Sequence, residues 1–346
     1  MALHRSASTT RACCANRLEI LDACDKCYCA LSRPGGRSHG IVWWTLLLFM
    51  VTSAFGQEPT PKVPREDVIS IQIGLDDAGF SPGQIDGKWG GMTRQALAAW
   101  QQAHELKPTG EFDADTAGNF PAGQGNTTNY VVTAADLAKL TRVPEDWRER
   151  SQLTNMWFET VVEMVAEKCH ASEGLIKTLN PGITDWTSIQ TNQSVSLLNL
   201  SPAKRVNAAK LRVNLSAKTV TAYDDDGKLI ALLPCSIAAD KEKRVPGQLT
   251  VQTVAVNPNY TFDPVNFPEL DDKQKGYGKL IVPSGPNNPV GSAWIGLSRV
   301  GYGIHGTPHP EQIGKTFSHG CFRLANWNAT RLAQMVVIGT PVEVVE

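Results

Sequence analysis

Two glycine-rich segments near the C-terminus carry the side chains best suited to chemistry in this 346-residue chain. The first is Gly301-Tyr-Gly-Ile-His-Gly-Thr-Pro308, and the second is Phe317-Ser-His-Gly-Cys-Phe-Arg323. They supply a thiol, two imidazoles, a hydroxyl and a guanidinium, and their glycines let the backbone bend sharply around a reacting group. A thiol attacks as its thiolate, so a catalytic cysteine needs a base within hydrogen-bond reach. The composition predicts nucleophilic catalysis by Cys321.

Either of two imidazoles is able to serve as the base for Cys321. His319 lies two positions before the cysteine, so the two side chains share a face of an extended segment, whereas His305 must come from a neighbouring strand or turn. Consecutive backbone N–H groups at Gly320 and Cys321 are suited to hold the oxyanion of an acyl-transfer intermediate. Arg323 shares the face of Cys321, and its planar fork is suited to a substrate carboxylate.

Two other interpretations fit these residue types. A cysteine in a glycine-rich turn is often a small buried apolar residue. A zinc site is the second alternative, with His305, His309, His319 and Cys321 as ligands. Structural zinc sites usually show tightly paired ligand spacings, which are missing here. Acyl transfer by a thiol is therefore the preferred interpretation, with no metal.

The segments Ile304-His-Gly-Thr and Ser318-His-Gly-Cys-Phe-Arg323 resemble the signature of the L,D-transpeptidase catalytic domain of the YkuD type. The resemblance implies that Cys321 is the acylated nucleophile, that His305 is its base, and that no cofactor is needed. It also implies that the Gly306 carbonyl orients the imidazole. The remaining predicted site residues are Ser318, His319 and Gly320, which line or orient the site, and Arg323 and Tyr302, which bind substrate.

The resemblance extends over residues 209–346, where apolar and polar residues alternate as in strands. Pro246-Gly247 resembles the remains of a Thr-Pro-x-Gly segment of the family. We expect a predominantly β domain, a sandwich or barrel-like sheet, with one helix over 327–337. The predicted strands cover 211–215, 219–223, 229–235, 249–256, 293–297 and 342–345. A long segment, 257–289, is hypothesised to form a wall or lid over the acyl-donor groove.

A three-helix domain is predicted over residues 66–120. Apolar residues recur at helical spacing from Val68 to Ala78, a second helix begins near Thr93, and Asp113 is a candidate cap for a third. The stretch Asp86-Gly-Lys-Trp-Gly-Gly-Met-Thr93 resembles the pattern of the small peptidoglycan-binding domain. A helical hairpin without a ligand is the alternative.

The middle of the chain, residues 130–200, is predicted to run strand, helix, helix, strand. This order resembles a LysM module, a glycan binder, and Ala166-Glu-Lys and Leu179-Asn-Pro are the best-matching pieces. The opening turn of that family is missing, and an insertion contains Pro144-Glu-Asp-Trp147. Glycan binding and a plain spacer role are both left open.

The first 56 residues are interpreted as a leader that contains a signal peptide. The apolar run Ile41–Val51 follows Arg33 and Arg37 and precedes small residues, as in a secretory signal. The run is short for a membrane span, so we expect cleavage in preference to a permanent membrane anchor. The expected location is the periplasm or cell envelope. Proline-rich residues 57–65 and residues 121–129 are predicted linkers.

Cysteine usage fits an exported enzyme with one reactive thiol. Five of the eight cysteines lie in the leader, at Cys13, Cys14, Cys24, Cys27 and Cys29. The rest of the chain keeps Cys169, Cys235 and Cys321, an odd number that leaves one thiol free for chemistry. We expect Cys169 and Cys235 to be buried thiols. The balance of 33 basic and 34 acidic residues gives no electrostatic case for nucleic acid.

The sequence predicts a multidomain α+β chain: a small three-helix domain, a LysM-like module and a predominantly β catalytic domain. The expected function is peptidoglycan L,D-transpeptidation in cell-wall cross-linking or remodelling, through a thioacyl-enzyme formed with a tetrapeptide stem and resolved by an amine. The alternatives are an L,D-carboxypeptidase or endopeptidase that uses the same cysteine, and a non-catalytic wall-binding protein. The expected partners are peptidoglycan and an envelope protein as acyl acceptor, and the expected state is a monomer.

Overall fold

The computed structural model describes residues 64–346 except 122–125, 203, 268, 317 and 319. The predicted leader and signal peptide lie outside this range, as does His319. All the described residues belong to one compact unit, Thr60–Glu346. Among the described helices, none has the length and apolar character that a membrane span requires.

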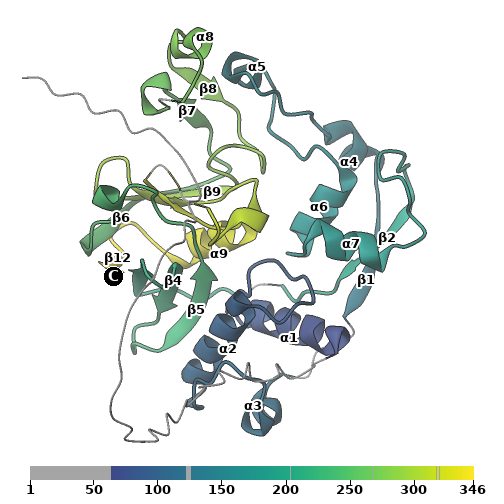
Figure 1. The fold of residues 1–346 in the computed structure, drawn as a ribbon, viewed down its shortest axis with the longest axis vertical. Helices are drawn as coiled ribbons and strands as arrows, with labels where there is room; N and C mark the ends of the chain where they lie inside the picture. Colours follow the sequence, from purple (N-terminus) through teal and green to yellow (C-terminus); the bar gives the residue numbers. More distant parts are fainter. Residues whose placement is uncertain (1–63, 122–125, 203, 268, 317, 319) are drawn as a thin grey trace, which may run out of the picture. The chain divides into compact units, whose positions relative to one another are not determined.

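The N-terminal part consists of three helices, α1 Arg65–Asp77, α2 Gly91–Ala103 and α3 Ala114–Asn119 (Figure 1). The predicted apolar face of α2 is buried, with Trp100 at its centre. The Asp113 side chain accepts from the Thr116 N–H, which confirms the predicted cap. The buried Gln72 side chain accepts from the backbone N–H groups of Asp86 and Gly87, so the Asp-Gly pair forms a turn fixed to α1.

The middle part follows the predicted order with two extra helices. Strand β1 Thr127–Val131 pairs antiparallel with β2 Ser194–Leu198. Helices α6 Val161–Lys168 and α7 Glu173–Leu179 match the two predicted helices, and Ser172 caps α7. The additional helices are α4 Ala134–Lys139 and α5 Trp147–Ser151, and α5 begins in the insertion noted in the sequence. Strand β1 begins inside the stretch predicted as a linker, 121–129.

The C-terminal part is built on one eight-stranded sheet in the order β11-β10-β9-β6-β12-β3-β4-β5. Beyond β5, Ser236 forms a bridge with Arg323 of β11, so the two ends of the sheet meet and the sheet is barrel-like. The predicted α+β fold class and the mostly β catalytic domain are confirmed. The strands are β3 Lys210–Asn214, β4 Thr219–Tyr223, β5 Leu229–Pro234, β6 Gly247–Val256, β9 Ala293–Leu297, β10 Gly303–His305, β11 Phe322–Arg323 and β12 Pro341–Val345.

One long helix covers this sheet. Helix α9 Asn326–Met335 packs on β9, β6 and β10 (Figure 1). Its Leu332 joins a buried apolar core that includes Leu211, Ile295 and Ile304. Cys235 belongs to the same core and Cys169 to the core of the middle part, and both are buried free thiols as predicted. Short 3₁₀ turns lie at Lys241–Lys243, Pro264–Asn266 and Pro310–Gln312.

The segment predicted as a long loop, 257–289, contains regular structure. Strands β7 Tyr260–Phe262 and β8 Leu280–Val282 form an antiparallel pair, and α8 Asp272–Lys275 lies between them. Alternation was not visible in the sequence because each strand has only three residues.

The three parts contact one another directly. The Ser81 N–H donates to the Leu232 carbonyl at 2.8 Å, so the N-terminal part adds a short bridge to the β5 edge of the catalytic sheet. The buried Asp76 carboxylate contacts His170 of the middle part at 2.7 Å and Arg331 of α9 at 3.2 Å. Burial raises the pKa of Asp76, but these two basic groups outweigh it and bring the pKa to about 2.

Candidate active site

The predicted base lies on β10, and the predicted nucleophile immediately precedes the strand that pairs with it. Strand β11 runs parallel to β10, with Ile304 opposite Phe322 and His305 opposite Arg323. Ile304 and Phe322 belong to the core, so His305 and Arg323 share the opposite face. The charge of Arg323 acts on His305 and on Cys321, so the guanidinium lies near both.

His305 is held as a neutral imidazole with a defined tautomer. It is 7% exposed, and its Nδ1 lies 2.7 Å from the carbonyl oxygen of Gly306. A carbonyl only accepts, so Nδ1 carries the proton and Nε2 is left as the acceptor. Burial lowers the pKa of His305 to about 4, and the charge of Arg323 contributes in the same direction. The contact with Gly306 is the one that the resemblance implied.

Cys321 immediately precedes β11, and its sulfur lies close to the segment before β10. Its Sγ lies 3.3 Å from the Gly301 carbonyl oxygen, which accepts from the thiol. Burial raises the pKa of Cys321 above its ordinary 9.0, while a hydrogen bond from Gly303 and the charges of Arg323 and Lys243 oppose that rise. At neutral pH the resting pair is therefore thiol and neutral imidazole, and the proton must move as the sulfur attacks.

The turn before Cys321 is fixed by the hydroxyl of Ser318. That hydroxyl accepts from the Gly320 N–H at 3.2 Å and donates to the carbonyl oxygen of Cys321. The Gly320 amide is thus directed at Ser318, and the Cys321 amide is the remaining candidate for an oxyanion donor. His319, the other predicted base, lies outside the described residues, and its role stays a prediction.

The two predicted substrate-binding residues are placed differently. Arg323 is half-buried opposite His305, and its Nη2 donates to the Thr316 hydroxyl at 3.4 Å. Tyr302 is 8% exposed and belongs to the hydrophobic core, where its ring meets Phe322 edge-on at 6.2 Å. Its hydroxyl has no hydrogen-bond partner among the described residues. A contact between Tyr302 and substrate stays a prediction.

The ligand set considered for zinc does not gather around Cys321 as far as the structure describes it. His309 is exposed and faces Glu311 at 3.6 Å. Within the described residues, no three His, Cys, Asp or Glu side chains lie close enough to hold a metal ion, and His319 is not among those residues.

The sequence reasoning missed two residues that shape the site. Trp294 lies opposite His305 on β9 and stacks on its imidazole, with ring centroids 5.6 Å apart. A Cβ at Gly303 would lie 2.5 Å from the Trp294 ring, so glycine is required where the indole crosses β10. Asn326 accepts from the Ser292 N–H and donates to the Pro286 carbonyl, fixing the loop beside Gly306. A tryptophan in an alternating strand gives no signal of its own beyond a strand residue.

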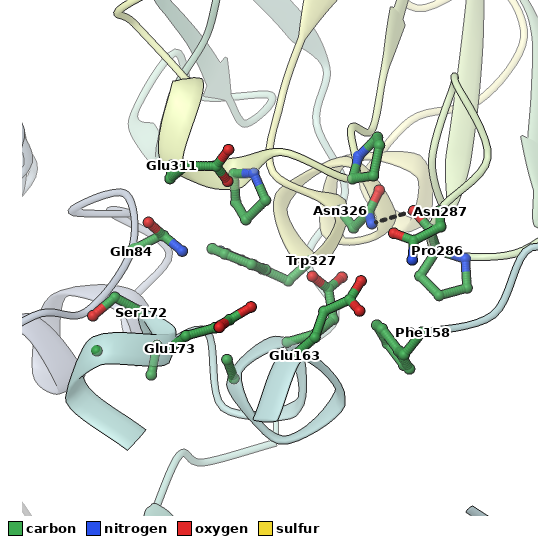
Figure 2. Close-up of a pocket in the computed structure, with 16 residues that line it drawn as sticks. Gln84, Phe158, Glu163, Ser172, Glu173, Pro286, Asn287, Glu311, Asn326 and Trp327 are labelled. Carbon is green, nitrogen blue, oxygen red and sulfur yellow. Dashed lines mark hydrogen bonds between the residues drawn. The ribbon is translucent and has the colours of Figure 1, made fainter. Parts of the chain in front are cut away.

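A separate pocket of about 300 Å³ lies between the three parts, and neither His305 nor Cys321 lines it. Figure 2 shows its glutamates and Trp327, with Asn326 reaching the backbone of Pro286 at one side. Burial raises the pKa of Glu167 to about 8, so this carboxyl is largely protonated at neutral pH. Because neither proposed reacting residue lines it, the pocket is not assigned as the reaction site. Its acidic lining residues are Glu163, Glu167, Glu173 and Glu311.

Two family models match the chain. Residues 208–344 match the L,D-transpeptidase catalytic domain, YkuD, and residues 64–118 match a peptidoglycan-binding domain. The chain therefore carries the catalytic domain of the L,D-transpeptidase enzymes, preceded by a peptidoglycan-binding domain, and both resemblances stated from the sequence are confirmed. The LysM-like character of the middle part stays a prediction.

Individual relatives bear the same family name. The chain is 27% identical over 186 residues to YkuD of Bacillus licheniformis, covering 54% of this chain and 93% of that protein. It is 42% identical over 69 residues to the L,D-transpeptidase YqjB of Bacillus subtilis, covering 18% of this chain and 39% of that protein. A solved L,D-transpeptidase from Mycobacterium smegmatis aligns with a TM-score of 0.32 and 21% identity over 45% of this chain and 64% of that chain.

Proposed function

We propose that the protein is a peptidoglycan L,D-transpeptidase that works through a thioester on Cys321. The sulfur attacks the carbonyl carbon that follows the L-centre of a tetrapeptide stem, and His305 Nε2 takes the thiol proton. The C–N bond to the terminal D-amino acid breaks, and that proton passes to the departing amine. An acceptor amine then attacks the thioester, which forms the new amide and returns the proton to sulfur.

The observation that carries this proposal is the pairing of β10 with β11. The pairing supports the proposal because His305 lies on β10 and Cys321 immediately precedes β11, while the Gly306 carbonyl fixes which imidazole nitrogen accepts a proton. Arg323 on the same face supplies a fixed positive charge for a stem carboxylate. The Cys321 amide, at the turn held by Ser318, is the proposed oxyanion donor.

The peptidoglycan-binding domain supports the wall as the substrate polymer. A binder on the same chain raises the local concentration of stems without a new catalytic contact. The apolar run at residues 41–51 supports export to the periplasm or cell envelope. We further propose that the acceptor is an amine of a neighbouring stem or of an envelope protein, and that the enzyme acts as a monomer.

Mass spectrometry of the intact protein tests the proposal. Incubation with a carbapenem should add the mass of one β-lactam to the wild type and none to Cys321→Ala. His305→Gln should slow the adduct by 10²–10⁴-fold, the usual contribution of a general base. An adduct that persists in Cys321→Ala would exclude the proposed nucleophile. With purified muropeptides, shortened stems without any cross-linked or exchanged product would instead identify a hydrolase.

A further inference from the structure

The hairpin formed by β7 and β8, here called the lid (Tyr260–Val282), is held by a segment of the middle part, here called the strut (residues 143–156). The two segments share one buried apolar cluster. Met156, Phe262 and Val282 are fully buried in it. Figure 1 shows α5 of the strut beside β7, β8 and α8 of the lid, and α5 packs on β8. The apolar core of the lid is therefore shared with the strut.

Aromatic stacking and one partly exposed acid join the two segments. The Trp147 indole stacks on Phe262, with ring centroids 4.3 Å apart and 15° between the planes, and it also contacts Tyr260 at 6.0 Å. The neighbouring Asp146 accepts from the Tyr277 hydroxyl at 2.6 Å and from Lys273 at 2.9 Å. The hydrogen bond from Tyr277, then that from Lys273, lowers the pKa of Asp146. Both hydrogen bonds of Asp146 join the strut to the lid.

The strut also forms backbone hydrogen bonds with the segment that connects the lid to β9. The Met156 N–H donates to the Ser284 carbonyl at 2.8 Å, and its carbonyl accepts from the Asn287 N–H at 2.9 Å. A Cβ at Gly285 would overlap the Met156 backbone, so this approach requires glycine. These two hydrogen bonds fix the strut to the segment that follows the lid.

The base of the lid lies next to the proposed catalytic base. Val256 and Ala293, the strand ends from which the lid leaves and returns, face each other across β6 and β9. The next residue of β9, Trp294, is opposite His305 on β10. The lid therefore leaves and rejoins the sheet beside the site. Burial raises the pKa of Tyr260 to about 12, and the charge of Cys321 adds to the shift, which indicates that the two side chains are near each other.

We infer that the strut is a working part of the active site, and that Trp147 and Asp146 are positioning residues that hold the lid and Tyr260 over the acyl-donor groove beside Cys321. The middle part thereby supplies a wall of the catalytic groove. A chain reduced to the catalytic domain would lack this wall. The inference rests on the proposed function, because its kinetic consequence is measured as acylation of Cys321.

The test compares Trp147→Ala with Trp147→Phe, Asp146→Asn and the control Trp186→Ala in the chain without its leader. Trp186 is partly buried against the core of the middle part, so the control makes the same truncation away from the lid. Three quantities are measured: amide hydrogen exchange of residues 260–282, the rate of Cys321 acylation by a carbapenem, and the rate of Cys321 alkylation by iodoacetamide.

In Trp147→Ala, lid exchange should speed up and acylation should fall by roughly 10- to 100-fold, since small displacements of positioning groups cost this much. Alkylation by the small reagent should stay equal or rise, because an open lid admits it. Misfolding also exposes the sulfur, so hydrogen exchange outside residues 260–282 should match the wild type if the loss of acylation comes from the lid alone. Asp146→Asn should show a smaller effect of the same kind, Trp147→Phe should recover most of the acylation, and Trp186→Ala should match the wild type.

Acylation of Trp147→Ala at the wild-type rate would overturn the inference, and so would an equal loss in Trp186→Ala. If Trp147→Ala does not fold, Asp146→Asn decides in its place, because it keeps the aromatic cluster. Unchanged lid exchange in Asp146→Asn would then contradict the role of the strut. A wild type that is never acylated would refute the proposed function instead, while hydrogen exchange still reports on the lid.

Discussion

The rate at which iodoacetamide modifies Cys321 should rise about tenfold per pH unit between pH 6 and 8, because only the thiolate reacts. Burial raises the pKa of Cys321 above 9.0. The thiolate fraction at pH 7 is then below about one molecule in a hundred. A cysteine ion-paired with a protonated histidine would be mostly thiolate at pH 6, and its alkylation rate would be nearly constant from pH 6 to 8. The ratio of the alkylation rate at pH 8 to that at pH 6 is thus about 100 for a resting thiol and about 1 for the ion pair.

The assay follows the Cys321 peptide by mass spectrometry at each pH, which separates it from the buried Cys169 and Cys235. His305→Gln should leave the slope of alkylation unchanged, because neutral His305 does not ionise the resting thiol. Carbapenem acylation of the wild type should rise as pH passes the His305 pKa of about 4, where the imidazole becomes a base, and then level off. A flat alkylation profile between pH 6 and 8 would refute a resting thiol and neutral imidazole.

Two further predictions concern a buried ion pair between parts of the chain and a tight turn beside Gly306. Asp76→Asn should lower the free energy of unfolding at pH 7 by about 3–5 kcal/mol, since it leaves Arg331 buried without its charged partner. The folded-state pKa of Asp76 is depressed, so the stability that its carboxylate contributes is present above pH 3.8 and is lost as pH falls toward 2. In urea unfolding, the difference in the free energy of unfolding between wild type and Asp76→Asn should therefore shrink by about 2 kcal/mol between these pH values. A difference that stays constant with pH would contradict the buried pair. Gly291→Ala should cost roughly 2–4 kcal/mol and slow acylation, because its Cβ would lie 2.6 Å from the Gly306 backbone at a positive φ of 63°; thermal melting and adduct formation at the wild-type level would show that this turn is tolerant.

The contact between His305 and the Gly306 carbonyl was predictable because both residues lie in one short segment whose types and order carry the chemistry. The pairing of His305 with Cys321 in the reaction stays a prediction. Most longer strands and helices followed from periodicity, but the two- and three-residue strands β7, β8, β10 and β11 and the short helices α4 and α5 did not, because they are too short to show a period. The sequence left a sandwich and a barrel-like sheet open, and the closure of the sheet through Ser236 corresponds to the second.

The contacts between parts could not be predicted from the sequence. Asp76, His170 and Arg331 are far apart along the chain, and none of them belongs to a periodic pattern that marks a partner. Trp147 was recognised only as part of an insertion that weakened a resemblance. Trp147 packs on the lid because the folded chain brings the two segments together, and no fixed spacing in the sequence marks such a long-range contact.

We propose that the sulfur of Cys321, next to β11, transfers an acyl group between stems with the help of the His305 imidazole on β10. Mass spectrometry of the products from purified tetrapeptide muropeptides, incubated with the protein and with Cys321→Ala, tests this transfer. We expect cross-linked stems together with one released terminal D-amino acid per bond formed, and neither product with the variant. Cross-links formed equally by Cys321→Ala would refute transfer through this sulfur.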